Sequence, residues 1–248
     1  MTKEWFLDWF GQEYLNLYAH RNDEEAERQV SFLLEILNEK PSKVLDIACG
    51  RARHLIAFAK LGIQGTGIDM SQPALDIAKE RIGELNLPVE LIHGDMRKVP
   101  VDDQSFPLLI SMFTSFGYFE TDQEHLDLLT EWGRCLSSQG TLIIDYLNRP
   151  QVLKNLVPKT VDNKAAKIIT QNRSLSSDGR RVNKEIIIEN TETGESKTFN
   201  ESVRMYEKKQ LLDLLEQADF HVKATYGDFD NSPHSDDSKR LLVVAEKK

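Results

Sequence analysis

The sequence lacks the features that mark secreted, zinc-stabilised or membrane-spanning proteins. It has only two cysteines, Cys49 and Cys135, and neither stands in a CxxC or Cys/His pattern. Two such cysteines make neither a disulfide framework nor a structural zinc site. No apolar run reaches the length that crosses a bilayer, and the first segment, MTKEWFLDWFGQEY, has no basic leader. We therefore expect a cytoplasmic protein with no membrane partner.

Positive charge is also scarce. The chain has 31 Lys and Arg residues against 40 Asp and Glu residues, a formal net charge of −9. Sequence-independent binding to nucleic acids depends on basic residues that release counterions from the phosphate backbone. The acidic balance therefore disfavours a nucleic-acid substrate. The length of 248 residues, with 40% apolar residues, suffices for one α/β domain with an elaboration.

From residue 43 to about 148, short apolar runs alternate with amphipathic stretches. The runs KVLDIA, GTGID, VELIHG, PLLISMF and TLIIDYL read as strands, and the segments between them read as helices. Near the end, HVKATYGDF and KRLLVVAEK read as an antiparallel hairpin. This alternation predicts an α/β fold with a doubly wound, mostly parallel seven-stranded sheet that ends in the hairpin.

Two regions depart from this alternation. Residues 1–39 read as two helices, one carrying apolar residues at helical spacing from Trp5 to Tyr18 and one capped by Asn22 or Asp23. Residues 149–205 contain period-two segments, KIITQN, RRVNKEIIIEN and SKTFNESVRMY, separated by turn clusters. We expect a small antiparallel β insertion at 149–205 in a main domain formed by 1–148 and 206–248.

The segment VLDIACGRARH, residues 44–54, predicts a strand, a turn of small residues and a helix. The small side chains of Ala48, Gly50 and Ala52 let backbone N–H groups and the helix N-terminus approach a ligand closely. Asp69 ends the next strand, where a carboxylate can accept two hydrogen bonds from a ribose. A dinucleotide-binding fingerprint requires glycine where Arg53 stands, so a nicotinamide-dependent oxidoreductase is disfavoured.

The same segment resembles motif I of the class I S-adenosylmethionine-dependent methyltransferases, D/E-x-G-x-G-x-G. It is read here as Asp46-x-Ala48-x-Gly50-x-Ala52, with alanine at two of the three glycine positions, which slightly narrows the turn. Three further matches follow in the expected order: IDM after the second strand, HGDMR after the third and ISMFTSFGYF after the fourth. The resemblance covers about residues 40 to 150 and is specific for binding of the methyl donor.

The resemblance implies S-adenosyl-L-methionine as the cofactor. It assigns the amino acid part of the donor to Asp46, Ala48 and Gly50, and the ribose to Asp69. Asp69 has an alternative interpretation, as a cap of the helix that starts at Ser71.

For the adenine side, the resemblance places Asp95 opposite the adenine amino group and the backbone N–H of Met96 beside the neighbouring ring nitrogen. Met70 and Met112 would line the purine and sulfonium pocket. Asp95, in a Gly-Asp pair, is alternatively a turn residue, and single methionines are more often core residues than ligand contacts.

In related small-molecule methyltransferases, an N-terminal helix closes over the donor. The resemblance therefore implies a helical lid at residues 1–39, with Tyr14, Tyr18 and Arg21 near the methionine carboxylate or the acceptor. Tyr14 is the candidate catalytic residue. The alternative is that both tyrosines belong to a core-facing stripe of the helix.

The chemistry itself requires little of the protein. Methyl transfer from a sulfonium is an in-line displacement, so alignment of donor and acceptor matters more than a dedicated nucleophile. The segment SMFTSFGYF lacks the N/D-P-P-Y tetrad typical of enzymes that methylate adenine N6 or glutamine. Asp145 is one candidate metal ligand, but a metal needs several. We expect a metal-independent enzyme.

The length of the insertion and the N-terminal helices resemble small-molecule N- or O-methyltransferases. We therefore expect methyl transfer from S-adenosylmethionine to a nitrogen or oxygen of a small polar metabolite, with residues 149–205 as a lid on the acceptor side. The alternatives are a transfer RNA nucleoside methyltransferase, which the acidic balance disfavours, and a non-catalytic S-adenosylmethionine-binding relative.

Overall fold

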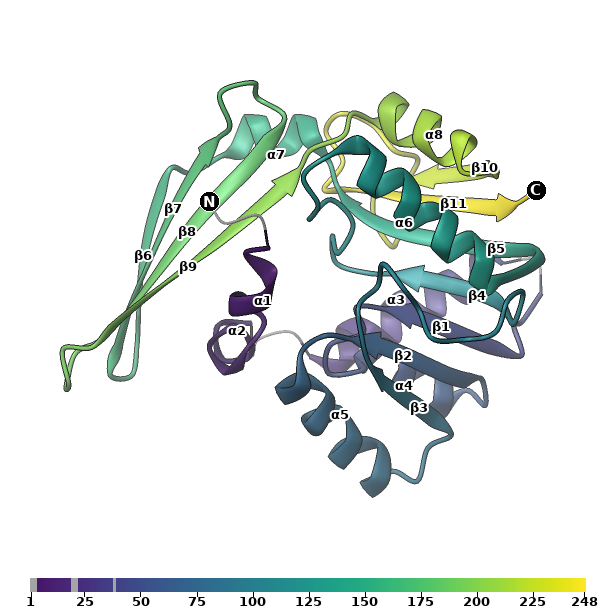
Figure 1. Cartoon of the computed structure of the whole chain (residues 1–248), viewed down its shortest axis with the longest axis horizontal. Coiled ribbons are helices and arrows are strands. Elements are labelled where there is room, and N and C mark those ends of the chain that lie inside the picture. The colour runs from purple at the N-terminus through teal and green to yellow at the C-terminus, as the bar shows by residue number, and fades with distance from the viewer. Residues whose placement is uncertain (1–3, 19–21, 38) are drawn as a thin grey trace.

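The computed structural model describes residues 4–18, 22–37 and 39–248, and in these it contains two sheets (Figure 1). The larger sheet has the strand order β10-β11-β5-β4-β1-β2-β3. Its strands are β1 (Lys43–Ile47), β2 (Gln64–Asp69), β3 (Val89–His93), β4 (Phe106–Ser111), β5 (Leu136–Leu147), β10 (Phe220–Tyr226) and β11 (Arg240–Lys247). Strands β1 to β5 pair in parallel, and β11 pairs antiparallel with both β5 and β10. The predicted seven-stranded sheet and its C-terminal hairpin are confirmed.

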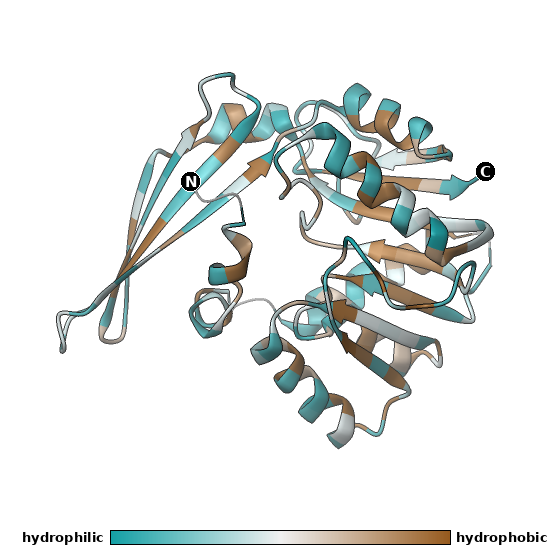
Figure 2. Ribbon diagram, viewed as in Figure 1, coloured by the Kyte–Doolittle hydropathy of each residue, from teal (hydrophilic) through white to brown (hydrophobic). Residues whose placement is uncertain are grey.

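Helices cover both faces of this sheet. They are α3 (Asp23–Ile36), α4 (Arg53–Lys60), α5 (Gln72–Glu84), α6 (Asp122–Cys135) and α8 (Lys208–Gln217). The buried side chains of α3, α4 and α5 belong to one hydrophobic cluster, and those of α6 and α8 belong to another. The predicted doubly wound α/β fold is therefore confirmed, and Figure 2 shows hydrophobic residues alternating with hydrophilic ones along these helices.

The helices begin where their sequences provide caps. The side chain of Asn22 accepts a hydrogen bond from the backbone N–H of Glu25 at 2.9 Å, as predicted for the start of α3. Thr121 and Glu124 form a reciprocal capping box at the start of α6. These local signals fix where α3 and α6 begin against the sheet.

Two glycines in β2 allow α4 to lie close to the sheet. A Cβ added at Gly67 would lie 2.5 Å from Leu55 Cδ1 and 2.6 Å from Cys49 Sγ, and one at Gly65 would lie 2.9 Å from Leu55 Cδ2. The absence of these two side chains leaves room for Leu55, which is fully buried. Cys49 is buried there as a packing residue.

The N-terminal segment differs from the prediction of one helix up to Tyr18. It forms two short helices, α1 (Phe6–Trp9) and α2 (Gln12–Leu17), separated at Gly11. Gly11 has an extended backbone with φ −92° and ψ −160°, which ends the first helix and reorients the second. The resulting bend places the helices between the two sheets (Figure 1).

The insertion is a four-stranded antiparallel sheet preceded by a helix. It contains α7 (Arg149–Asn155) and the strands β6 (Lys159–Lys164), β7 (Lys167–Leu175), β8 (Arg181–Asn190) and β9 (Ser196–Arg204), in the order β6-β7-β8-β9. The predicted antiparallel meander is confirmed. Helix α7 and strand β6 were not predicted, because both are short and β6 is a mostly polar segment, KTVDNK.

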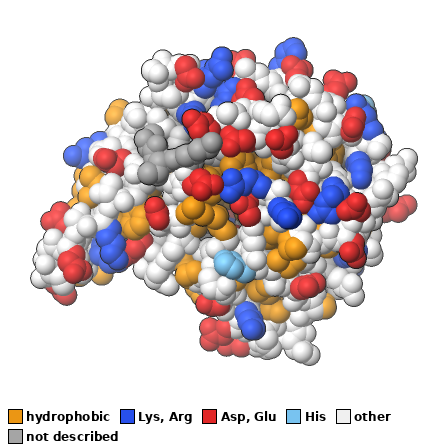
Figure 3. All heavy atoms as spheres, in the orientation of Figure 1, with side chains coloured by type: hydrophobic (Ala, Val, Ile, Leu, Met, Phe, Trp, Pro, Cys, Tyr) orange, Lys and Arg blue, Asp and Glu red, His pale blue; other side chains and the backbone are white. Residues whose placement is uncertain are grey.

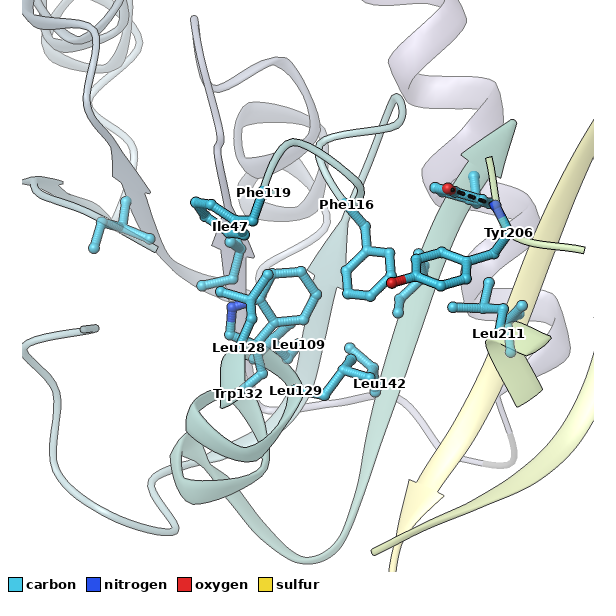
Figure 4. Close-up of a cluster of buried hydrophobic side chains, with 14 of the residues drawn as sticks. Ile47, Leu109, Phe116, Phe119, Leu128, Leu129, Trp132, Leu142, Tyr206 and Leu211 are labelled. Carbon is cyan, nitrogen blue, oxygen red and sulfur yellow. Dashed lines mark hydrogen bonds between the residues drawn. The ribbon is translucent and has the colours of Figure 1, made fainter. Parts of the chain in front are cut away.

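The four-stranded sheet shares the main hydrophobic core. Ile169, Ile186 and Ile188 on its inner face belong to the same buried cluster as α1, α6 and α8. The rings of Trp9 and Phe199 lie 4.8 Å apart, between α1 and β9. Figure 4 shows another part of this cluster, where Leu128, Leu129 and Trp132 of α6 pack with residues of the large sheet, the loop after β4 and the start of α8: Ile47, Leu109, Leu142, Phe116, Phe119, Tyr206 and Leu211. The sheet is therefore anchored by packing as well as by its two connections.

Acidic and basic side chains are interspersed over the face seen in Figure 3. Among the described residues, no helix has the length and apolar character needed to cross a bilayer.

The close approach of α4 to β2 can be tested with a matched pair of glycine substitutions. Gly67→Ala should lower the free energy of unfolding by about 1–3 kcal/mol, because its Cβ overlaps Leu55 and Cys49. Gly83→Ala, in α5, meets no atom within 4 Å and should raise the free energy of unfolding by about 0.5–1 kcal/mol. Urea unfolding of the two variants measures both effects, and equal changes would contradict the close packing at Gly67.

Candidate functional site

A cavity lies at the carboxyl ends of β1, β2, β3 and β4, and the N-terminal helices close its other side. Ligands of open α/β sheets bind at this edge, where the turns after the strands meet. The cavity wall includes ten of the residues named from the sequence: Tyr14, Tyr18, Asp46, Ala48, Gly50, Asp69, Met70, Asp95, Met96 and Met112. Arg21, the remaining one, lies outside the described residues.

The turn after β1 has the backbone conformation of a glycine-rich loop. Ala48, Gly50 and Ala52 all have left-handed φ angles, of 59°, 54° and 56°. Such φ angles cost an alanine about 1 kcal/mol relative to glycine. The two alanines therefore adopt the conformation that the motif glycines would have, and the turn keeps its backbone N–H groups near the cavity.

Asp69, at the end of β2, joins two turns of the cavity wall. Its Oδ2 atom accepts a hydrogen bond from the N–H of Gly50 at 2.7 Å, and its Oδ1 atom accepts one from the N–H of Ser71 at 2.7 Å. The N-cap of α5 is Ser71, whose hydroxyl accepts a hydrogen bond from the N–H of Ala74. Asp69 is therefore not the capping residue. Burial raises the pKa of Asp69, although these backbone hydrogen bonds oppose the shift.

Asp46 is the most deeply buried acid in the cavity wall, with a relative exposure of 1%. Its Oδ2 atom is buried without a hydrogen-bond partner among the described residues. Burial and then the nearby charge of Asp69 raise its pKa well above the usual range. A buried acceptor without a partner is costly, so this wall suits a ligand that brings a cationic donor.

The adenine side of the predicted site lies after β3. Asp95 receives hydrogen bonds from Arg97: its Oδ1 atom from the backbone N–H at 2.8 Å and its Oδ2 atom from Nε at 2.9 Å. Partial burial alone would raise the pKa of Asp95, but the hydrogen bonds from Arg97 outweigh this effect and lower it. Asp95 is thus a turn residue and also borders the cavity. The backbone oxygen of Met96 accepts a hydrogen bond from Trp132 Nε1 at 3.2 Å, which fixes this turn against α6.

Aromatic residues form the wall opposite the strands. The ring of Tyr14 lies 4.8 Å from those of Phe10 and Tyr18, and the ring of Phe10 lies 5.6 Å from that of Tyr118. Phe10 and Tyr118 therefore join the tyrosines of α2 to the loop after β4. The hydroxyl of Ser71 also donates to the backbone oxygen of Phe10, which ties this segment to the start of α5.

Asp145 holds the loop after β4 through two contacts. It pairs with Arg240, and its Oδ2 atom accepts a hydrogen bond from the N–H of Phe113 at 2.9 Å. Phe113 and Thr114 both have left-handed φ angles there. No cluster of three or more potential metal-ligating side chains occurs in the part of the chain that the structure describes.

The four-stranded sheet also supports the loop after β4. The guanidinium of Arg181, on β8, donates to the backbone oxygens of Phe119 at 2.7 Å, Tyr118 at 3.2 Å and Gly117 at 3.3 Å. No motif marks Arg181 in the sequence, because these three partners are backbone atoms more than 60 residues away.

Residues 44–140 match a protein-family model described as a methyltransferase domain. The whole chain is similar in fold to the CcbJ methyltransferase from Streptomyces caelestis, with a TM-score of 0.81 and 17% identity over 97% of this chain and 98% of that chain. Residues 44–140 therefore form a methyltransferase domain, and the chain has the fold of S-adenosylmethionine-dependent methyltransferases.

Two further methyltransferases are similar over most of their length. The proposed methyltransferase YqeM of Bacillus subtilis (strain 168) is 26% identical over 215 residues, which are 83% of this chain and 84% of that protein. CalS10 from Micromonospora echinaspora, an amino pentose methyltransferase, has a TM-score of 0.70 and 17% identity over 96% of this chain and 97% of that chain. This methyltransferase therefore shares its fold with relatives along nearly its whole length.

The position of Asp69 leads to a prediction for donor affinity. Asp69→Ala should weaken S-adenosylmethionine binding about 10- to 100-fold, because it removes a charged acceptor and releases the N–H groups of Gly50 and Ser71. Asp76→Ala, which removes an exposed carboxylate of α5, is the matched control. Calorimetry measures affinity, and thermal unfolding checks that both variants fold. An unchanged affinity of the Asp69 variant would remove Asp69 from the donor site.

His54, which also borders the cavity, leads to a prediction for pH dependence. Its Nε2 atom lies 2.7 Å from Gln29 Oε1, and burial, then the charges of Arg53 and Arg240, lower its pKa to about 3. As the pH falls, His54 is therefore protonated in the unfolded chain at a higher pH than in the folded protein. Stability should be full above about pH 6.5 and fall by about 1.4 kcal/mol per pH unit below it, for this one group.

Urea unfolding at several pH values measures this slope. His54→Gln should reduce it, whereas His221→Gln, at an exposed position of β10, should leave it unchanged. The same slope in the His54 variant and the wild type would contradict the assignment.

Proposed function

We propose that this methyltransferase transfers a methyl group from S-adenosylmethionine to a nitrogen or oxygen of a small polar metabolite. The observation that carries the proposal is the pair of carboxylates formed by the buried Asp46 and the half-buried Asp69, in a cavity that aromatic side chains close. A site with two carboxylates shielded from water favours cationic ligands, and the sulfonium and ammonium groups of the donor are both cationic.

The residues present fit the amino acid and ribose parts of the donor. Asp46 Oδ2 is a buried acceptor that the ammonium group of the donor can satisfy. The left-handed turn at Ala48 and Gly50 borders the cavity, and its small side chains let the same part of the ligand approach the backbone closely. Each oxygen of Asp69 already accepts one N–H group and has a further lone pair for the ribose hydroxyls.

The remaining assignments concern the adenine. Asp95 and the N–H of Met96 border the part of the cavity after β3, where they would receive the edge of the purine ring. Met70, directly after β2, and Met112, directly after β4, also line the cavity. Their flexible, polarisable side chains suit a planar ring and a sulfonium.

When bound, the donor supplies an activated methyl group for an in-line displacement. The chain must align the acceptor and exclude water. Phe10, Tyr14, Tyr18 and Tyr118 form the wall that faces the carboxyl ends of the strands, which is the place for the acceptor. We assign Tyr14 to contact the acceptor, as the candidate catalytic residue, and Tyr18 to close the donor site.

The residues that form the cavity wall also support the assignment of two lids. Residues 1–39 supply the aromatic side of the cavity and therefore form the N-terminal lid. Residues 149–205 support the N-terminal lid, because Lys167 of β7 pairs with Glu13 of α2 at 2.7 Å. We assign this insertion to the acceptor side of the main domain, which comprises residues 1–148 and 206–248.

A small metabolite fits the charge and the relatives better than a nucleic acid. The net charge of −9 opposes attraction to a phosphate backbone. CalS10, an amino pentose methyltransferase, shares the fold over 97% of its own length. An acceptor of comparable size and polarity is consistent with an enclosed site of this kind.

Calorimetry with S-adenosylmethionine, S-adenosylhomocysteine and reduced nicotinamide nucleotide tests the donor. We expect binding of the first two in the micromolar range and no binding of the third. Formation of S-adenosylhomocysteine with a panel of small amines and alcohols then tests methyl transfer. Donor binding without turnover of any acceptor would favour a non-catalytic relative, and turnover with transfer RNA alone would identify the nucleic-acid alternative. Binding of the nicotinamide nucleotide alone would overturn the proposal.

A further inference from the structure

A second concave surface lies between α7 and the inner face of the four-stranded sheet. We call it the α7 groove. Its walls are mostly apolar, and they include Val152, Leu156, Val157, Val182 and Val203. Three charged side chains stand among these: Arg173 of β7, Lys184 of β8 and Glu201 of β9.

The three charged residues form one row across the sheet. Arg173 is the register partner of Lys184, and Lys184 is the register partner of Glu201. Like charges directly opposite each other on neighbouring strands are destabilising. Lys184 is compensated, because its Nζ atom lies 3.0 Å from Glu201 Oε2.

Arg173 has only neutral partners. Its guanidinium donates to Gln171 Oε1 at 2.8 Å, to Thr160 Oγ1 at 3.2 Å and to the backbone oxygen of Val157 at 3.4 Å. Among the described residues it makes no ion pair. A half-buried guanidinium held by neutral oxygens beside a second cation keeps its charge available for an anion.

The groove therefore has a local charge opposite to that of the molecule. Its wall carries two cations and one carboxylate, whereas the whole chain has a net charge of −9. The neutral oxygens around Arg173 orient the guanidinium but do not neutralise it. Apolar walls next to this charge reduce screening by water and strengthen its attraction for an anion.

One side chain separates this groove from the donor cavity. Tyr18 lines the cavity, and its hydroxyl accepts a hydrogen bond from Lys184 Nζ at 2.5 Å and donates one to Glu201 Oε1 at 3.3 Å. Lys184 and Glu201 line the groove on the other side of this contact. The groove and the donor cavity therefore meet at the contacts of Tyr18 with Lys184 and Glu201.

We propose that the α7 groove binds an anionic group of the acceptor, a carboxylate or a phosphate, through Arg173. This inference rests on the proposed function, because it names the chemical class of the acceptor. Lys184 contributes to the local positive charge, and the valines beside it contact the apolar part of the same molecule. The acceptor would then lie across Tyr18, with its anionic end in the groove and its methyl-accepting atom in the donor cavity.

A titration without donor or acceptor tests the anion site itself. The Nε–Hε signals of the arginines are followed by ¹H–¹⁵N spectroscopy in the full-length protein, during addition of inorganic phosphate or of acetate, with chloride at equal ionic strength. We expect the signal of Arg173, identified by its loss in Arg173→Lys, to shift saturably with at least one of the two anions. The stronger response identifies phosphate or carboxylate as the preferred group.

Arg180→Gln is the matched control. It removes the same charge from an exposed side chain in the turn before β8. In the variants that lack the Arg173 signal, the backbone amide signals of Thr160 and Val182, which line the groove, report anion binding. Arg173→Gln should weaken anion binding at least 10-fold, Arg173→Lys should restore part of it, and Arg180→Gln should change it less than 2-fold. No saturable shift of Arg173, or equal effects of Arg173→Gln and Arg180→Gln, would overturn the anion site.

Turnover separates this inference from the proposed function. With an acceptor that carries an anionic group, Arg173→Gln should raise KM for the acceptor about 10-fold and leave kcat and the affinity for S-adenosylmethionine unchanged. An unchanged KM would overturn the role of the groove while methyl transfer stands. Absence of methyl transfer in the wild type would instead overturn the proposed function, whatever the anion titration shows.

Discussion

The donor side of the cavity depends on the half-buried carboxylate of Asp69. Asp69 holds the turn after β1 through Gly50 and the start of α5 through Ser71. Three residues of the turn after β1 have left-handed φ angles, and two of these are alanines with an energetic preference for other conformations. The hydrogen bond from Gly50 to Asp69 offsets part of this strain. The carboxylate of Asp69 therefore both stabilises the shape of the turn and supplies negative charge to the site.

The aromatic side of the cavity depends on contacts with the four-stranded sheet. Trp9 Nε1 donates to Glu201 Oε1 at 2.6 Å, and the hydroxyl of Tyr18 contacts the same carboxylate. Arg181, on the neighbouring strand β8, donates hydrogen bonds that hold the loop after β4. The insertion is thus a structural support for both aromatic segments, and its inner face is continuous with the main core. A class I methyltransferase domain without such an insertion would need another means to hold an N-terminal helix in this place.

The parts of the molecule that could be predicted from the sequence are those with local signals. The alternation of β1 to β5 with helices, the Asn22 cap and the turn at Ala48 and Gly50 each depend on residues close together in the chain. Gly11 shows the limit of such signals: the aromatic spacing on both sides of it is helical, yet the bend it permits is settled by packing between the sheets. The spacing thus predicted helical structure correctly but not its division in two.

The supporting residues of the site could not be predicted in this way. Glu201 and Lys184 occupy ordinary alternating positions of β9 and β8, and their partner Tyr18 is more than 160 residues away. The interpretation of Asp95 as a turn residue and its place at the cavity are both compatible with the structure, because a short loop can serve both purposes. Asp145 shows the reverse: an acid that the sequence leaves as a lone metal candidate is paired with Arg240.

The bond between Trp9 and Glu201 joins residues 192 positions apart. Synthesis proceeds from the N-terminus, so the aromatic segment leaves the ribosome long before the strand that holds it. The strands of the donor side, complete by residue 147, can pair earlier, but the wall formed by α1 and α2 docks only after β9 has been made. Contacts of such long range also slow folding. A nascent chain therefore closes this cavity only after residue 204, the last residue of β9, has been made.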